Sequence, residues 1–262
     1  MAVNLCTEKM KRVIAEIHEV MQGISLSGLT AWQKEDRSFV TTLDLNLQAK
    51  YIEIIRKYFP DHNILHEEGK PENMGYDSPY TWVIDPIDGT DNMVKGRKEY
   101  SSCVGLMRGN HFIAAVVYFP EFKECYTALE TGGVAKNSEK YIAPQVPGGN
   151  NEIILCSKSH RNLKDIFIST GYNVACYYCA TYSLLKLLKG EALVYHTKNT
   201  KLYDVGPMSY ILSKAGIRVY NRCGDTMTFR PSLDIIPFFI AAAKKEWVNT
   251  FIMKIGNENE CK

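Results

Sequence analysis

The stretch Trp82-Val-Ile-Asp-Pro-Ile-Asp-Gly-Thr-Asp-Asn92 is the most informative segment of this 262-residue chain. Its apolar beginning predicts a short buried strand, residues 80–85, that ends in the carboxylate of Asp85. Pro86 stiffens the turn that follows, and Asp88 places a second carboxylate three residues after the first. Gly89 then allows the backbone to bend closely past whatever the two carboxylates hold. We therefore expect an acidic cluster at the end of a buried strand.

Two carboxylates at one strand end repel each other, because like charges a few ångströms apart cannot both stay ionised cheaply. A hard divalent cation with a preference for oxygen ligands, such as Mg²⁺, relieves that conflict. Thr90 and Asp91 suit the start of a helix, and the free N–H groups of such a start suit an anionic phosphate. The same residues also permit a simpler interpretation, a tight turn whose aspartates only cap the backbone.

Two further acidic elements favour the metal interpretation. Glu67 and Glu68 lie in an expected loop just ahead of the strand, and Asp204 begins a predicted helix far downstream, where its charge complements the helix dipole. Each has a plainer alternative: a solvated surface pair for the glutamates and an N-cap for Asp204. Taken with the strand-end carboxylates, they indicate several acidic groups that meet at one site.

The composition is that of a globular protein with a sizeable core, since 45% of the residues are hydrophobic and 23% are charged. A net charge of +2 gives no electrostatic case for a nucleic acid polymer or an anionic membrane as partner. There is no apolar run of the roughly 20 residues that span a bilayer and no signal-like start, so we expect a cytoplasmic location. The eight cysteines are scattered and are expected to be reduced and mostly structural, including the Cys176/Cys179 pair.

The apolar periodicity predicts most of the secondary structure. Helices are expected at about 7–21, 43–58, 163–170, 182–188 and 204–215, and strands at 80–85, 101–107, 112–119, 122–129, 152–157, 191–195 and 235–242. Residues 59–79 are expected to form a loop. A stretch rich in Pro, Gly and Asn at 144–151 predicts a boundary between an N-terminal α+β half, 1–148, and a C-terminal α/β half, 149–262, of one compact unit. Such an order predicts sheets covered by helices, an α/β or α+β fold.

Several short motifs together resemble the inositol monophosphatase superfamily. They are Val40-Thr-Thr-Leu-Asp44, Glu67-Glu-Gly69, Trp82–Thr90, Tyr203-Asp204 and the helix end Lys-Ala-Gly216. The Asp-Pro-Ile-Asp-Gly-Thr segment is highly specific, whereas the other motifs are persuasive only in combination. The resemblance implies a layered α-β-α-β-α sandwich of the inositol monophosphatase/fructose bisphosphatase type.

The resemblance also implies a lithium-sensitive phosphatase that uses two or three Mg²⁺ ions to hydrolyse a phosphate monoester of a small metabolite. Members of the family are often homodimers, which leaves a homodimer open here. Thr90, with Glu67 or Asp44, matches the group that orients the attacking water, and the N–H groups of Gly89 and Thr90 match the phosphate-binding amides. The matches to the metal ligands are the carboxylates of Glu67, Asp85, Asp88 and Asp204 and the carbonyl of Ile87.

Some departures from the family pattern bear on the substrate. Thr197 stands where inositol phosphatases commonly carry a glutamate that contacts sugar hydroxyls, and Asp91-Asn-Met93 replaces the usual Thr-Asn-Phe. The segment Ser157-Lys-Ser-His160 resembles the Ser-Arg-Ser-His of 3′-phosphoadenosine-5′-phosphate phosphatases. Lys158 and His160 would then meet a second phosphate; otherwise the segment is a polar helix start on the surface. Asp91, Lys158, His160 and Thr197 are thus the candidate substrate contacts.

Several functions remain open on these residues. The first is hydrolysis of an inositol or sugar monophosphate, and the alternative is a 3′(2′),5′-bisphosphate nucleotidase. Fructose 1,6-bisphosphate is a less favoured substrate. A protein that binds a phosphorylated metabolite without turnover is a separate class, but it has no need of a full set of metal ligands. A structural protein with acidic caps requires several coincidences.

Overall fold

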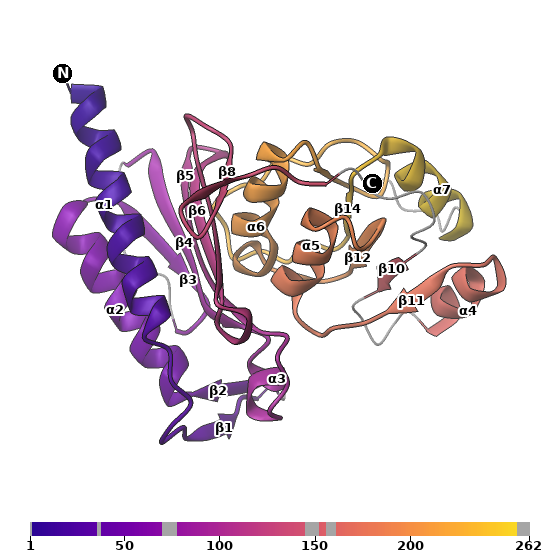
Figure 1. Ribbon diagram of the computed structural model, residues 1–262, viewed down its shortest axis with the longest axis horizontal. Coiled ribbons are helices and arrows are strands. Elements are labelled where there is room, and N and C mark those ends of the chain that lie inside the picture. The colour runs from indigo at the N-terminus through magenta and orange to yellow at the C-terminus, as the bar shows by residue number, and fades with distance from the viewer. Residues whose placement is uncertain (1, 36–37, 70–77, 145–151, 156–160, 256–262) are drawn as a thin grey trace.

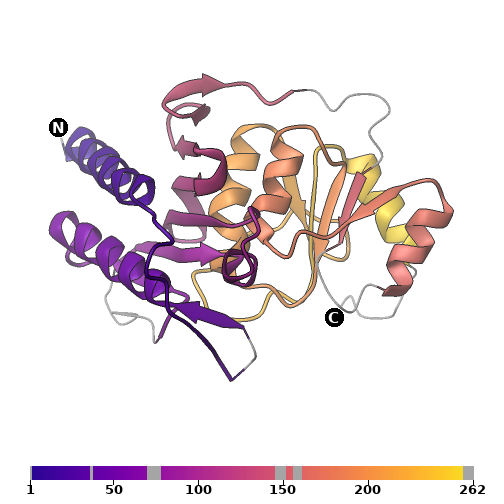
Figure 2. The ribbon, with the colours of Figure 1, turned by 60° about the horizontal axis from the view of Figure 1, so that its bottom comes forward.

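The computed structural model describes residues 2–35, 38–69, 78–144, 152–155 and 161–255. Five layers follow one another in the order helix, sheet, helix, sheet, helix (Figure 1). Figure 2 shows the same order from another direction, with the first two helices on one side and the last helices on the other. This is the predicted α-β-α-β-α sandwich, and the fold expectation is confirmed.

The first three layers hold the N-terminal part of the chain and the central helices. Helices α1 (Ala2–Gln22) and α2 (Thr42–Tyr58) cover one face of a seven-stranded sheet. Helices α5 (Ala180–Leu188) and α6 (Leu202–Lys214) pack between the two large sheets. The strands of the first sheet, in spatial order, are β3 (Asn63–His66), β4 (Tyr80–Asp88), β5 (Ser101–Arg108), β6 (His111–Phe119), β7 (Glu124–Leu129), β8 (Val134–Lys136) and β9 (Glu139–Tyr141).

The remaining layers contain a five-stranded sheet and two outer helices. Helices α4 (Arg161–Ser169) and α7 (Lys245–Ile255) lie beyond this sheet, at the right of Figure 1. The strands, in spatial order, are β11 (Asn173–Ala175), β10 (Glu152–Leu155), β12 (Val194–Thr197), β14 (Phe239–Ala242) and β13 (Arg218–Tyr220). Three short elements complete the fold: the pair β1 (Ala31–Gln33) and β2 (Phe39–Thr41), helix α3 (Thr90–Val94) and the 3₁₀ turn η1 (Pro120–Phe122).

Some sequence expectations differ from the structure. The expected loop at 59–79 contains β3, whose four residues are all buried although two of them are polar. Strand β4 continues past Asp85 to Asp88, because a bulge between these residues lets Asp88 still pair with Ser101 of β5. Helix α7 and the short strands β8, β9, β11 and β13 were not predicted. The expected strands at 191–195 and 235–242 are in fact β12, shifted toward the C-terminus, and the shorter β14.

The expected boundary at 144–151 lies almost wholly outside the described residues. One apolar cluster joins residues from both sides of it, such as Val117 and Tyr126 with Ile154 and Leu184. The division into two halves therefore stays a prediction. No described helix has the combination of length and apolar character that a bilayer crossing requires.

Two residues of helix α6, Gly206 and Pro207, determine how this helix contacts the first sheet. Pro207 lies inside the helix and has no N–H, so the carbonyl of Tyr203 loses its usual partner one turn earlier. The Cys103 thiol of β5 donates to that carbonyl at 3.5 Å. At Gly206 a Cβ atom would lie 2.6 Å from the Phe112 ring, so glycine lets α6 approach β6 closely.

Candidate functional site

The end of strand β4 presents two carboxylates in different environments. Asp85 is 1% exposed, and its Oδ1 has no hydrogen-bond partner within the described part of the chain. The Oδ2 of Asp88 accepts from the backbone N–H and the hydroxyl of Thr181, each at 2.6 Å, and from the Cys179 thiol at 3.1 Å. Asp85 therefore has an oxygen without a hydrogen-bond partner, whereas Oδ2 of Asp88 accepts three hydrogen bonds from the protein.

Asp204 occupies the third position of helix α6 rather than the N-cap that the plainer interpretation assigned to it. Its Oδ2 accepts from the Thr200 hydroxyl and from the backbone N–H of Lys201, both at 2.8 Å. This is half of a capping box, in which the carboxylate satisfies a backbone donor that the helix leaves free. Because Oδ2 makes both hydrogen bonds, capping the helix and binding a ligand through Oδ1 are compatible roles.

Asp44 occupies the equivalent third position of helix α2. Its Oδ2 accepts from the backbone N–H of Thr41 at 2.9 Å and bonds the Thr41 hydroxyl, while its Oδ1 accepts from the Thr90 hydroxyl at 3.1 Å. The Thr90 hydroxyl also lies 2.8 Å from the carbonyl oxygen of Ile87. The structure thus brings together Asp44, Ile87 and Thr90, three residues that the sequence motifs placed in one site.

Gly89 permits the turn that joins the carboxylates to helix α3. Its φ angle is +86°, and a Cβ atom there would lie 2.8 Å from the carbonyl oxygen of Glu99. A side chain is therefore excluded both by backbone conformation and by space. The helix predicted to follow Gly89 is present and starts at Thr90.

Glu67 and Glu68 follow strand β3, and both form ion pairs with the side chain of Lys34. The ammonium of Lys34 lies 3.1 Å from Oε1 of Glu67 and 2.6 Å from Oε1 of Glu68. Gln48 of α2 holds the backbone of Glu68 on both sides, donating to its carbonyl at 2.6 Å and accepting from its N–H at 3.0 Å. Glu68 is buried, so the interpretation of the two glutamates as a solvated surface pair is wrong.

Burial and repulsion between carboxylates raise the pKa of three acidic groups in this site, Glu67, Asp85 and Asp204. Burial raises the pKa of Asp85 well above its usual range, and the charges of Glu67, Asp88 and Asp204 raise it further. Burial also raises the pKa of Glu67 to about 8, against a smaller lowering by Lys34. Burial, followed by repulsion from Asp88, raises the pKa of Asp204 to about 7. These carboxylates therefore lie close enough together for their negative charges to repel one another across the site.

The donor set fits a hard divalent cation. Among the described residues, no three carboxylate, imidazole or thiolate groups already surround a common point as they would around a bound ion. However, the Oδ1 of Asp85 is a buried carboxyl oxygen without a hydrogen-bond partner among the described residues, and a cation would satisfy it. Asp88 and Asp204 each use one oxygen for protein donors, which leaves the other for a ligand. Carboxylate oxygens are the ligands that Mg²⁺ prefers.

The four candidate substrate contacts have different surroundings. Asp91 is half-exposed and pairs with Lys95 at 2.6 Å, one turn along α3. Thr197 is buried at the end of β12, three residues before Thr200. Lys158 and His160 lie outside the described residues. The substrate-binding roles of all four stay predictions.

Sequence reasoning missed several residues that support the carboxylates. Capping boxes have a local signature, and Thr41-x-x-Asp44 shows it. Lys34, Gln48 and Thr181 reach the site across 20 or more residues of sequence, and no local pattern indicates them. Cys179 was expected to be structural; it is a buried thiol that also contacts Asp88, whereas its neighbour Cys176 is exposed.

Comparison with known proteins agrees with this architecture. A curated fructose-1,6-bisphosphatase/inositol-1-monophosphatase of Aquifex aeolicus is 35% identical over 108 residues, which are 41% of this chain and 40% of that protein. The Nus factor SuhB of Haemophilus influenzae is 33% identical over 165 residues, 63% of this chain and 54% of the relative. The matches to these relatives thus span about half of their length.

The solved structures show the same fold at lower identity. A structure described as IMPase/NADP phosphatase complexed with Mg²⁺ and phosphate superposes with a TM-score of 0.78 at 21% identity, over 98% of this chain and 95% of the other. The extragenic suppressor protein suhB of Bartonella henselae gives 0.76 at 17% identity, over 98% and 99%. The family model for the inositol monophosphatase family matches residues 2–252. The chain therefore belongs to the inositol monophosphatase family.

Proposed function

We propose that this chain hydrolyses a phosphate monoester of a small metabolite with Mg²⁺ bound at the carboxylate site. The observation that carries the proposal is the buried, unpartnered Oδ1 of Asp85, a group whose pKa is raised by burial and by repulsion from the neighbouring acidic groups. Without a cation, the site can relieve this cost only by keeping protons on its carboxyl groups. Membership of the family, and the Mg²⁺ and phosphate named in the description of a structural neighbour, support the assignment.

The proposed ligands are oxygen atoms from both halves of the chain. When bound, Mg²⁺ supplies charge neutralisation and acidifies water, as two or three ions do in such sites. The chain contributes rigidity to the ligands: Thr181 fixes one oxygen of Asp88, and Thr200 with Lys201 fixes one of Asp204. The complete ligand set is Glu67, Asp85, Asp88 and Asp204 through their carboxylates and Ile87 through its carbonyl.

Thr90 and Asp44 are proposed to orient the attacking water and to receive its proton. The Thr90 hydroxyl donates to Asp44 Oδ1 at 3.1 Å, so an oxygen lone pair remains to accept from a water. Burial raises the pKa of Asp44, which makes this carboxylate a better proton acceptor than one in water. Glu67 is the alternative partner that the motifs indicate, and its pKa is raised to about 8.

The N–H groups of Gly89 and Thr90 are proposed to bind the phosphate. They lie at the start of α3, directly after Asp88, where backbone donors point away from the helix. Gly89 is required at this turn, because its φ angle is +86° and Glu99 and Cys179 already fill the space where a side chain would start. Phosphoryl transfer needs such positioning and charge neutralisation more than covalent help from the protein.

The substrate class that we propose is an inositol or sugar monophosphate. One similar solved structure, 20% identical, is described as a dual specific IMPase/NADP phosphatase bound with D-inositol-1-phosphate. The alternative is 3′-phosphoadenosine 5′-phosphate, which the Ser157-Lys-Ser-His160 motif favours. Replacing Lys158 with Ala should raise the KM for this bisphosphate at least about tenfold and leave monophosphates unchanged if the motif binds a second phosphate. Equal effects on both classes would remove the bisphosphate alternative.

A substrate panel tests the proposed function. Phosphate release is measured from inositol 1-phosphate, 3′-phosphoadenosine 5′-phosphate, fructose 1,6-bisphosphate and glucose 1-phosphate, with Mg²⁺, with a chelator and with added LiCl. We expect turnover that requires Mg²⁺, is inhibited by lithium and is fastest on a monophosphate. Folded protein that binds Mg²⁺ calorimetrically but releases no phosphate from any of these compounds would instead be a metabolite-binding protein.

Thr181 offers a test of how the ligands are held. Replacing it with Val removes the hydroxyl that donates to Asp88 and keeps the shape and the backbone N–H. We expect Mg²⁺ affinity to fall by about 10- to 100-fold, as for other groups that orient a metal ligand. Thr181→Ser should restore most of it, since it restores the hydroxyl. Calorimetric Mg²⁺ titration measures both; equal affinities for the Val and Ser variants would contradict the positioning role.

A further inference from the structure

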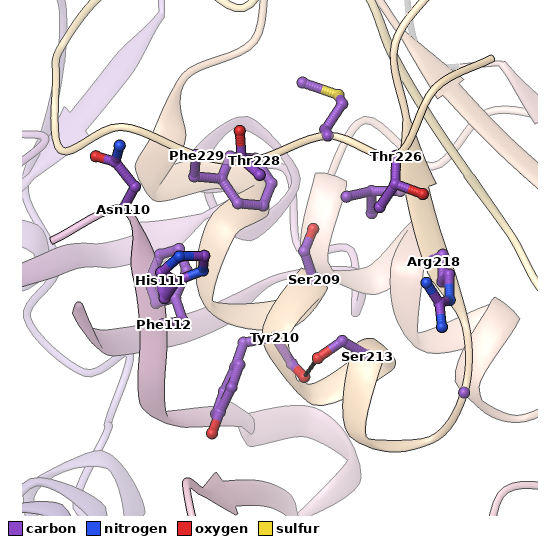
Figure 3. Close-up of a pocket in the computed structure, with 13 residues that line it drawn as sticks. Asn110, His111, Phe112, Ser209, Tyr210, Ser213, Arg218, Thr226, Thr228 and Phe229 are labelled. Atoms are coloured by element: carbon purple, nitrogen blue, oxygen red, sulfur yellow. Dashed lines mark hydrogen bonds between the residues drawn. The ribbon is translucent and has the colours of Figure 1, made fainter. Parts of the chain in front are cut away.

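The residues that meet the organic part of the substrate must lie close to the turn that is proposed to bind the phosphate. A cavity of about 360 Å³ beside helix α6 does not meet this condition. Its walls come from the start of β6, the second half of α6, β13 and the segment 226–229 (Figure 3), and none of the proposed metal ligands is among the described residues that line it. Asp88 and Gly89, by contrast, are partly exposed, so the phosphate-binding turn is open to a ligand there.

The segment 177–181 is fastened to this turn at both of its ends. At one end, the side-chain amide of Asn92, in α3, donates to the carbonyl of Tyr177 at 2.7 Å. At the other end, Thr181 donates to Asp88 Oδ2 from its backbone N–H and from its hydroxyl, each at 2.6 Å. These contacts join parts of the chain that are 85 or more residues apart in sequence. The tertiary structure therefore fixes the position of this segment beside the turn.

Cys179 brings the middle of the segment into direct contact with the turn. Its Cβ lies 3.0 Å from the position that a Cβ atom on Gly89 would take, and its thiol donates to Asp88 Oδ2 at 3.1 Å. Consecutive Cα atoms are about 3.8 Å apart. The backbone of Tyr178, the preceding residue, is therefore held beside the turn that is proposed to bind the phosphate.

Tyr178 has a backbone conformation that is unfavourable for a tyrosine. Its φ angle is +53°, in the left-handed region that glycine occupies readily and that is uncommon for a residue with a large side chain. Tyr178 is also 55% exposed, so its ring contributes less burial to offset this strain than a core ring would. Strained residues of this kind cluster at active sites and at places where a ligand is held. The combination of strain and exposure indicates a role for the ring outside the stability of the fold.

We propose that Tyr178 is a specificity-determining residue whose ring packs against the organic part of the substrate. This inference rests on the proposed function, because it takes a phosphate bound at Gly89 and Thr90 as its fixed point. A tyrosine ring offers a rigid apolar face with a polar tip, which suits a phosphate ester whose organic part is a cyclitol or sugar ring. The contacts of Tyr177 and Thr181 hold the intervening backbone before the substrate arrives, so the ordering cost of binding is reduced.

Two phosphonates of equal charge test this contact without turnover, since their P–C bond is not an ester bond. Methylphosphonate has almost no organic part, whereas cyclohexylmethylphosphonate places a ring where the ring of a cyclitol phosphate would be. Each is titrated by calorimetry into the full chain with saturating Mg²⁺. We expect the parent protein to bind the cyclohexylmethyl compound at least about fivefold more tightly, which is the size of one good aromatic contact.

Two variants at position 178 separate the ring from the backbone conformation. Tyr178→Phe keeps the ring and should keep the preference of the parent. Tyr178→Asn removes the ring but tolerates the left-handed conformation; it should reduce the preference to less than about twofold and leave the affinity for methylphosphonate unchanged. Ser138→Asn is the matched control, because Ser138 is another left-handed residue, in the turn between β8 and β9. This control should keep the full preference.

The outcomes distinguish the role of Tyr178 from the phosphate site itself. Equal affinity of the two phosphonates for the parent, or an undiminished preference in Tyr178→Asn, would overturn the role of Tyr178 and leave the phosphate site standing. A urea midpoint of Tyr178→Asn below that of the parent would show that the ring serves the fold, which also overturns this role. Failure of methylphosphonate to bind the parent would instead overturn the proposed phosphate site, and this inference with it.

Discussion

Replacing Asp85 with Asn is expected to reduce Mg²⁺-dependent phosphate release by about a thousandfold or more, which corresponds to about 4 kcal/mol of transition-state stabilisation. The amide keeps the shape of the side chain and loses the negative charge that the proposed cation requires. Asp85 is a better position for this test than Asp88, because no protein group donates a hydrogen bond to its Oδ1. The substitution therefore removes no hydrogen bond at that atom. Initial rates across a Mg²⁺ titration measure the loss.

The same variant should be more stable than the parent protein when no metal is bound. In the parent, Asp85 is buried beside Glu67, Asp88 and Asp204, and their charges raise its pKa; a neutral amide removes this repulsion. Denaturant unfolding in chelator should show a higher midpoint for Asp85→Asn, and added Mg²⁺ should raise the midpoint of the parent much more than that of the variant. Asp165→Asn, on the exposed face of α4, is the matched control and should match the parent in both assays. Full activity in Asp85→Asn would remove the metal mechanism.

The parts of the site that could be predicted from sequence are those that lie within a few residues of one another. Asp85, Asp88, Gly89 and Thr90 lie in one short stretch of sequence, at the end of β4 and the start of α3, whose composition already indicates a cation beside backbone donors. Helix α2 could be predicted from its periodicity because it buries one face against a sheet. Joining these pieces into one fold required the family resemblance as well, because the spacing of the motifs does not by itself give the order of strands.

The parts that could not be predicted depend on contacts between distant segments. Lys34 reaches Glu67 from the β1–β2 connection, and Thr181 reaches Asp88 across 93 residues of sequence. Strand β3 escaped prediction because Asn63 and His66 are polar yet buried.

The stability of the metal-free protein should fall as the pH rises from about 6.5 to about 8. Burial raises the pKa of Glu67 from 4.5 to about 8 and that of Asp204 from 3.8 to about 7. In this window the folded chain keeps protons that the unfolded chain has already lost. The folded state then binds more protons, and the free energy of unfolding decreases by about 1.4 kcal/mol per pH unit for each such proton.

The pH range of this test matters, because a buried histidine changes the free energy of unfolding in the opposite direction at lower pH. Burial lowers the pKa of His62 from 6.5 to about 4, so between these values the unfolded chain binds the additional proton and stability rises with pH. The unfolded imidazole is half protonated at pH 6.5, so this contribution fades over the next pH unit while that of the carboxylates continues. Urea midpoints in chelator at pH 6.5, 7.2 and 8 should therefore decrease in the parent, and decrease less in Asp85→Asn, where one source of repulsion is gone. Saturating Mg²⁺ should flatten the decrease, because the cation replaces the protons as the partner of the carboxylates. A metal-free midpoint that stays level or rises over this range would show that the carboxylates do not share one buried site.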